Sequence, residues 1–241
     1  MADRQSRELP NGAVVHTVMS DVGDGDLAVH GEAAALAERR RRLCPHPWTW
    51  LRQVHGDGLV VVSVPAQHAG ETADASVTAV PDAALAVQVA DCAPVLLWAP
   101  VAGGGGQGDG PGAVVAAVHA GWKGLEAGVV ARAVEAMRTL GAGAIDWTLG
   151  PCISPAAYEF GAADLDRLAA RLGPAVRGAT EDGHPALDLR AAVAGALAAT
   201  GVTAPPCGPP PACTATSGRH FSHRGRGESA RQVGVIWWDR P

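Results

Sequence analysis

Near its middle the chain reads Val114-Val115-Ala116-Ala117-Val118-His119-Ala120-Gly121-Trp122-Lys123-Gly124. The apolar run at the start predicts a strand over 114–118, and the apolar pattern that follows predicts a helix over 125–140. Small residues between the two permit a tight strand-to-helix turn. We therefore expect His119 at the end of a rigid strand, beside an open loop, where catalytic and binding groups are often held.

Further strands and helices are expected on both sides of this unit. Apolar runs predict strands at 48–54, 59–64, 85–89, 95–98, 145–149 and 233–238, and helices at 32–43, 163–172 and 189–199. Asp188 is expected to cap the last helix, and Gly141 to end the helix after His119. Because strands and helices mix without regular βαβ alternation, the pattern favours the α+β class over a doubly wound sheet.

The composition indicates one globular domain over residues 1–241. The net charge is −5, which argues against a general nucleic-acid binder. No apolar run approaches the roughly 18 residues of a membrane span, and residues 1–8 lack the apolar core of a signal peptide. We expect a cytoplasmic protein with no nucleic-acid or membrane partner, either a monomer or a small homo-oligomer.

Two biased segments have ordinary structural interpretations. Residues 103–112 are glycine-rich and lie between two apolar runs, so we expect a flexible loop; the GxxxxGK[ST] pattern of a phosphate-binding loop is absent. The run Arg39-Arg40-Arg41-Arg42 ends a predicted helix, where cations complement the negative end of the helix dipole. We expect a solvated helix end there.

Three predicted strand ends carry reactive side chains: His55 in Gln53-Val54-His55-Gly56, Cys92 in Ala90-Asp91-Cys92-Ala93-Pro94, and His119. Two histidines and a thiol could bind zinc and leave a fourth position open. Their separations are too long for spacing alone to establish a site. Each residue by itself is also compatible with a purely structural role, and the five scattered cysteines are expected to be free thiols or ligands.

Two places could bind an anion. The helix after His119 would direct its free N–H groups toward the turn that holds Lys123. Near the C-terminus, residues 219–227 combine several cations with Phe221. Arg224 could hold a phosphate or carboxylate and Phe221 could stack on a base, although an exposed basic loop explains the same residues.

Taken together, these segments resemble the YfiH family, also called laccase-domain or polyphenol-oxidase-like proteins, over residues 50–238. The matching blocks are Gln53-Val54-His55-Gly56, Ala73-Asp74-Ala75, Ala90-Asp91-Cys92-Ala93-Pro94-Val95-Leu96, Ala116-Ala117-Val118-His119-Ala120-Gly121-Trp122-Lys123-Gly124, Leu149-Gly150-Pro151-Cys152-Ile153, Tyr158-Glu159, Leu187-Asp188-Leu189 and Phe221-Ser222.

The resemblance implies an α+β fold with a three-layer arrangement of mixed β-sheets flanked by helices, similar to the catalytic domain of cytotoxic necrotizing factor toxins. It implies that His55, Cys92 and His119 bind zinc, with copper as the less favoured metal. It further implies phosphorolysis of adenosine, inosine, guanosine and S-methyl-5′-thioadenosine, together with deamination of adenosine.

Roles for the remaining candidates follow from these two reactions. In deamination, zinc activates a water for attack on C6 of adenine, and Asp91 beside the cysteine ligand is the expected acid or supporting partner of a ligand. In phosphorolysis, phosphate attacks C1′ of the sugar, and Lys123 and Arg224 are the expected phosphate contacts. Phe221 and Gln53 complete the expected substrate-binding set.

The chain departs from the family pattern at its anion-binding positions. Residues 19–25 stand where members carry a "STRxGG" block and lack its arginine, Lys123 replaces an arginine, and His223-Arg224-Gly225 replaces "YRR". These changes predict weaker phosphate binding or a different anion.

Two other functions remain open. Cys92 could act without metal as a nucleophile that cleaves an amide or ester of a cell-wall precursor or peptide, or the site could only bind a ligand. A true multicopper laccase is disfavoured, because the chain has nine histidines and no H-x-H pair.

Overall fold

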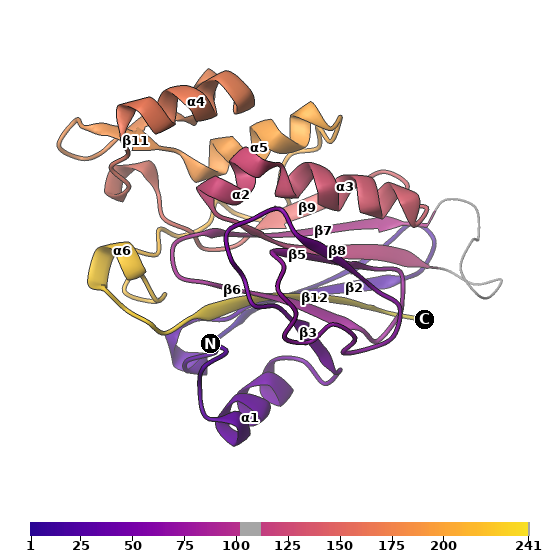
Figure 1. Cartoon of the computed structure of the whole chain (residues 1–241). Coiled ribbons are helices and arrows are strands. Elements are labelled where there is room, and N and C mark those ends of the chain that lie inside the picture. Colours follow the sequence, from indigo (N-terminus) through magenta and orange to yellow (C-terminus); the bar gives the residue numbers. More distant parts are fainter. Residues whose placement is uncertain (102–111, 241) are drawn as a thin grey trace.

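The computed structural model describes residues 1–101 and 112–240, and it contains two five-stranded sheets packed face to face (Figure 1). Helices cover the outer face of one sheet, and a single helix lies below the other. The glycine-rich loop expected at 103–112 falls outside the described residues, except for Gly112. The mixture of sheets and helices confirms the α+β class.

The first sheet has the order β1-β2-β12-β6-β3, with all neighbours antiparallel except β3 and β6. The strands are β1 (Asp3–Glu8), β2 (Val14–Met19), β12 (Gln232–Asp239), β6 (Ala84–Val89) and β3 (Trp48–Trp50). Side chains of β12 alternate between the two faces. Val235 and Trp237 pack toward α1 (Ala33–Leu43), whereas Ile236 and Trp238 pack against the second sheet.

The second sheet has the order β4-β5-β8-β7-β9, and its central strand is β8 (Ala113–Ala120). The others are β4 (Leu59–Val62), β5 (Ala75–Thr78), β7 (Ala93–Pro100) and β9 (Asp146–Leu149). Every residue of β8 is buried, since the first sheet covers one face and helices cover the other. A strand covered on both faces reads as a continuous apolar run. Burial on both faces explains why the apolar pattern of residues 114–118 correctly predicted a strand.

The helix expected over 125–140 is two helices. α2 (Trp122–Ala127) begins three residues earlier than predicted, and α3 (Val129–Thr139) follows it. Gly128 separates them at φ +102°, a left-handed conformation that L side chains rarely adopt. α4 (Ala162–Leu172), α5 (Leu189–Ala199) and the short α6 (His223–Arg226) complete the helices. None of the helices in the described ranges is long and apolar enough to cross a membrane.

Several strands escaped prediction. β1 is a polar edge strand, and β2, β5, β10 (Arg177–Ala179) and β11 (Pro185–Leu187) are short or mixed in character. Short 3₁₀ turns at Val22–Asp24, Pro155–Ala157 and Pro174–Val176 were also not expected. The strand expected over 48–54 ends at Trp50. The chain leaves the sheet there and enters the loop that carries His55.

The arginine run at the end of α1 is only partly a solvated surface. The guanidinium of Arg40 lies 5.0 Å from the ring centre of Trp50 and 5.7 Å from that of Trp48. Burial lowers the pKa of Arg40. A cation over an aromatic face is attracted to the ring. This arginine therefore helps to attach α1 to β3.

Asp188 caps α5 as the sequence predicted, and the cap can be tested. Its carboxylate accepts from the backbone N–H groups of Arg190 and Ala191. Asp188→Ala should lower the free energy of unfolding by about 1 kcal/mol, because both donors lose their acceptor. Asp188→Asn keeps an acceptor oxygen and should cost much less. Urea denaturation followed by circular dichroism measures both variants; equal losses would contradict the capping role.

Candidate active site

Three side chains from distant parts of the sequence meet at one edge of the molecule. His55, Cys92 and His119 each offer a ligand atom, and these atoms lie within 4.8 Å of one another. The two imidazole rings meet edge to face, with centres 4.7 Å apart. His55 is exposed, Cys92 is partly exposed and His119 is buried, so the cluster opens to solvent on one side. Three ligands with an open side form the arrangement of a catalytic metal centre.

The second sheet positions two of the three residues. His119 is near the end of β8, and Cys92 precedes β7 directly. Because β7 and β8 are antiparallel neighbours, with Pro94 paired to His119, the turn before β7 and the end of β8 lie side by side. His55 comes from the loop after β3 and has φ +61°, an uncommon value for a residue other than glycine.

Asp74 joins the loop of His55 to the end of β8. Its carboxylate is fully buried and accepts from His119 Nδ1 at 2.7 Å and from the backbone N–H groups of His55 at 2.9 Å and Gly56 at 2.8 Å. Burial would raise the pKa of Asp74, but the bond to His119 and the backbone donors outweigh it and lower the pKa. With Nδ1 directed at Asp74, the other ring nitrogen of His119 is left for a ligand.

The thiol of Cys92 and the buried imidazole of His119 each favour the charged form of the other. Burial opposes ionisation of Cys92, but the charge of His119 and hydrogen bonds from both histidines lower the pKa of the thiol to about 6. Burial likewise opposes the charged form of His119, but the Cys92 charge and Asp74 raise its pKa to about 9. A thiolate is the form of cysteine that binds metals and attacks carbon. The three residues therefore suit either chemistry.

Gly121, between β8 and α2, leaves room for the ligand side chains. A Cβ at Gly121 would lie 2.8 Å from Cδ2 of His55 and 3.1 Å from Sγ of Cys92. A Cβ at Gly124 would lie 2.9 Å from the carbonyl oxygen of Gly56. Both glycines thus serve close packing of α2 against the site, in addition to the turn.

A cavity of about 490 Å³ opens onto the three ligands. Its volume lies within the range of roughly 300–1,000 Å³ that is usual for small-molecule sites. Two aromatic rings, Trp122 and Tyr158, form part of its wall, and the side chains of Arg52, Arg224 and Arg231 bring positive charge to it. The cavity can therefore accept a flat, partly apolar molecule that also carries a negative group.

Two predicted substrate contacts lie outside this cavity. Lys123 is exposed, and its ammonium lies 5.5 Å from the ring centre of its neighbour Trp122. Phe221 does not line the cavity either, and its backbone is paired with the side chain of Gln232. A helix that starts at Trp122 directs the next residue outward, which explains the misplacement of Lys123.

Arg224 and Gln53 do line the cavity, but their side chains differ in how far their hydrogen-bonding groups are already used. The guanidinium of Arg224 lies 5.1 Å from the ring centre of Tyr158. The amide of Gln53 donates to the carbonyl of Gln88 and accepts from its N–H, both at 2.7 Å. The main role of Gln53 is therefore to fasten its loop to β6.

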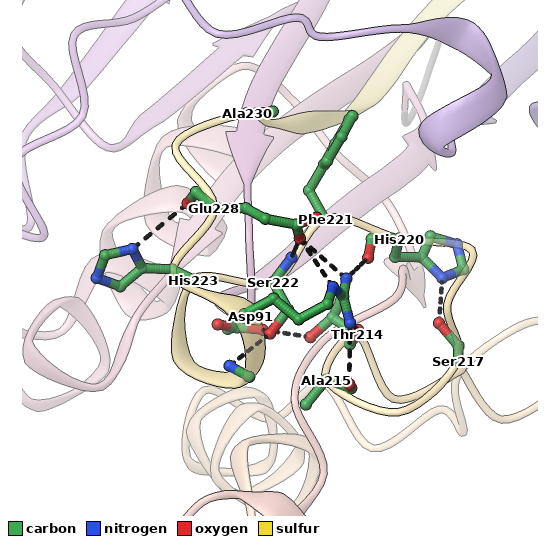
Figure 2. A network of polar contacts seen from close by, with 12 residues as sticks. Asp91, Thr214, Ala215, Ser217, His220, Phe221, Ser222, His223, Glu228 and Ala230 are labelled. Atoms are coloured by element: carbon green, nitrogen blue, oxygen red, sulfur yellow. Dashed lines mark hydrogen bonds and ion pairs between the residues drawn. The ribbon is translucent and has the colours of Figure 1, made fainter.

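Asp91 holds the C-terminal segment through a network of hydrogen bonds (Figure 2). One carboxylate oxygen accepts from the hydroxyls of Thr214 at 2.5 Å and Ser222 at 2.7 Å, and the other accepts from the backbone N–H of Arg224 at 2.6 Å. These donors occupy both oxygens. Asp91 therefore positions α6, and its expected role as the acid of deamination or as a supporting partner of a ligand stays a prediction.

No role was predicted for Asp74, Trp122, Tyr158 or Arg52. Asp74 stood within a matching block, and an acidic residue enclosed by alanines before a strand is a usable signal for a buried carboxylate. The two aromatic residues also stood in matching blocks. Arg52 lies one residue before a matching block, and nothing in the sequence marks it as a residue of the site.

Asp74→Asn tests the link between the two histidines. The amide would present N–H groups to donors that now require an acceptor, so we expect Zn²⁺ affinity to fall about 10- to 100-fold. Competition with a chelating dye measures this affinity. Asp57→Asn is the matched control, because Asp57 lies in the same loop and pairs with Arg132 instead of the histidines. Unchanged affinity in Asp74→Asn would contradict the role of Asp74.

Comparison with known proteins places the chain in a family. A family model described as multi-copper polyphenol oxidoreductase laccase matches residues 16–239. A purine nucleoside phosphorylase of Streptomyces griseus is 41% identical over 225 residues, which cover 90% of this chain and 85% of that protein.

Solved structures show the same fold. Neisseria meningitidis protein NMB0706 has a TM-score of 0.76 and 26% identity, with 98% of this chain and 99% of that chain covered. The YfiH protein of Bacillus licheniformis has a TM-score of 0.73 and 22% identity, with 96% and 98% covered. Since the family model spans most of the sequence, the chain belongs to the laccase-like YfiH family, as its resemblance to YfiH proteins predicted.

Proposed function

We propose that this protein is a zinc-dependent purine nucleoside phosphorylase that also deaminates adenosine. The observation that carries the proposal is one cavity that combines the three potential metal ligands, two aromatic rings and exposed arginine. The name of the Streptomyces griseus relative supports the phosphorylase part. Zinc and deamination rest on the donor set and on the family resemblance.

The purine base would contact Trp122 and Tyr158. Both rings line the cavity, and Phe160 supports them through edge-to-face contacts at 5.4 Å to Trp122 and 5.5 Å to Tyr158. Burial, together with the charge of Cys92, raises the pKa of Tyr158 to about 12. The phenol therefore stays protonated at neutral pH and offers a donor to an uncharged nucleoside.

Phosphate would bind Arg224 and Arg52. Within the described ranges, the guanidinium of Arg224 makes one long hydrogen bond, at 3.4 Å to the carbonyl oxygen of Glu159. Arg52 is exposed and has no side-chain hydrogen bond or ion pair within the described ranges. Arg231, in contrast, donates to the carbonyls of its own loop. Arg52 would thus supply a cation that the departures from the family pattern had removed elsewhere.

His55, Cys92 and His119 would hold the zinc ion. One thiolate and two imidazoles are ligands that zinc and copper both accept. When bound, zinc polarises substrate oxygen atoms and lowers the pKa of a water molecule. The protein's own contribution is to hold the ligands through Asp74 and to keep the base against Trp122.

A second candidate function is favoured by one observation. The thiol of Cys92 contacts the ring of His119, and that ring contacts the carboxylate of Asp74. A cysteine nucleophile, its base and the group that orients the base are connected in the same way. This arrangement would suit cleavage of an amide or ester in a peptide or cell-wall precursor. Selective labelling of Cys92 by iodoacetamide in metal-free, active protein would favour it over the first function.

Incubation of the purified protein with adenosine, with and without phosphate, tests the main proposal. Chromatography separates the products. Adenine and ribose 1-phosphate formed only with phosphate would indicate phosphorolysis, and inosine formed in either mixture would indicate deamination. Absence of all these products in zinc-loaded protein would contradict the proposed function.

Arg224→Ala should mainly impair phosphorolysis. Loss of a charge-assisted hydrogen bond costs about 1.5–3 kcal/mol, so the KM for phosphate should rise roughly ten- to a hundredfold. Adenosine is neutral and deamination uses water, so inosine formation should stay within a few-fold. Lys123→Ala is the matched control, because Lys123 is a nearby cation outside the cavity. Equal losses of both reactions in Arg224→Ala would assign Arg224 to structure or to nucleoside binding.

Cys92→Ala should remove both the zinc ion of this site and the activity, while the thermal unfolding temperature stays close to that of the metal-free protein. A chain of this length buries a sufficient core without a metal. Elemental analysis and a thermal melt measure the two effects. Cys207→Ala is the control, because this partly exposed thiol lies outside the cavity. Full activity in Cys92→Ala would exclude both candidate functions.

A further inference from the structure

We infer a second divalent metal site at the opposite end of the first sheet, formed by His16, His46, Asp82 and Asp239, here called the distal cluster. Asp82 lies just before β6, whereas Cys92 lies just after it. The two sites are therefore separated by the length of that strand, on the order of 20 Å at about 3.3 Å per residue. The distal cluster lies outside the cavity of the proposed active site.

Four segments converge at this point. His16 is on β2 and Asp239 ends β12, which is hydrogen-bonded to β2. His46 lies between α1 and β3, and Asp82 lies between β5 and β6. A bound ion would consequently connect two turns to the ends of two central strands.

The distances suit a metal ion of ordinary size. His46 Nε2 lies 3.1 Å from Asp239 Oδ1 and 3.9 Å from Asp82 Oδ1, and His16 Nε2 lies 3.2 Å from Asp239 Oδ2. Ligand atoms of His46, Asp82 and Asp239 all fall within 4.8 Å of one another. Tetrahedral ligands at about 2.0–2.2 Å from zinc stand roughly 3.3–3.6 Å apart. Small side-chain shifts would bring these atoms to that spacing.

One carboxylate oxygen of the cluster lacks a hydrogen-bond donor. Asp239 Oδ1 is buried and has no hydrogen-bond partner within the described ranges, even though His46 Nε2 is 3.1 Å away. Buried carboxylate oxygens normally have a partner. A cation between the imidazole nitrogen and this oxygen would satisfy both atoms. The Asp239 side chain as a whole is 36% exposed, so an ion could reach this oxygen from solvent.

The two imidazoles are already held in place. His16 stacks on Trp237, with ring centres 5.0 Å apart and an interplanar angle of 16°, and its Nδ1 contacts the hydroxyl of Ser6 at 2.8 Å. His46 meets the edge of the same indole at 6.0 Å. Ligating histidines characteristically use their second nitrogen in such an outer contact, which fixes the ring. For His16, this leaves Nε2 directed at Asp239.

The donor set selects the class of metal. The two carboxylates bring negative charge that a divalent cation would balance, and each imidazole offers a nitrogen lone pair to it. Imidazole with carboxylate suits zinc, cobalt or nickel. Among the described residues, no cysteine sulfur belongs to the group of ligand atoms that lie within 4.8 Å of one another at this place. The distal cluster should therefore lack the thiolate that marks the proposed active site.

Titration with Co²⁺ tests the assignment, because thiolate-bound cobalt has a charge-transfer band that imidazole and carboxylate ligands lack. Chelator-treated wild-type protein should bind two ions per chain, one with this band. Cys92→Ala should retain one ion without the band. His46→Asn in the Cys92→Ala background should weaken the remaining binding at least tenfold, and Asp239→Asn should do the same.

The matched control is His68→Asn in the same background. His68 also contacts a carboxylate, that of Glu71 at 2.7 Å, but has no second imidazole beside it. It should bind cobalt as the Cys92→Ala parent does. If Cys92→Ala binds no cobalt, or if His46→Asn and His68→Asn bind equally, the distal site is excluded. His46 lies in a turn, so its variant provides a test even if Asp239→Asn fails to fold. None of these readings depends on nucleoside turnover.

Discussion

The structure depends on one buried carboxylate. An ionised group without water must be paired or hydrogen-bonded, because burying it alone costs several kcal/mol. Asp74 meets this requirement only if the loop of residues 54–56 folds back over the start of β5 and the ring of His119 turns toward it. The same requirement sets the backbone of His55 in an uncommon conformation. The geometry of the candidate metal ligands is thus a consequence of satisfying Asp74.

Asp91 solves a similar problem on the other wall. It collects three donors from the C-terminal segment, and so closes the cavity with residues that lie more than 120 positions away in the sequence. The two acidic residues nearest to the reactive thiol and imidazole therefore organise the backbone. Under the proposed function, the chemistry would fall to the thiol, the imidazoles, the phenol of Tyr158 and the arginines.

The sequence was informative where a pattern reported burial directly. The strands at 85–89 and 114–118 are covered on both faces, so their continuous apolar character predicted them correctly. Asp188 correctly predicted the start of α5. It was silent where structure depends on distant partners. The polar strand β1 forms because it pairs with β2. The break between α2 and α3 at Gly128 was not predicted, because the apolar pattern continues across it. At the site, motifs predicted the candidate ligands, which the structure brings together, but the exposure of Lys123 depends on the first turn of α2.

The position of β12 has a consequence for synthesis. This strand is the last of those described, yet it lies at the centre of the first sheet, between β2 and β6. As the nascent chain leaves the ribosome, β2 and β6 have no common neighbour until residues 232–239 emerge. Non-local pairings of this kind form late and leave apolar strands exposed while they wait. The growing polypeptide therefore exposes the edges of β2 and β6 until residues 232–239 pair with them, and a chain without β12 would be unable to complete the first sheet.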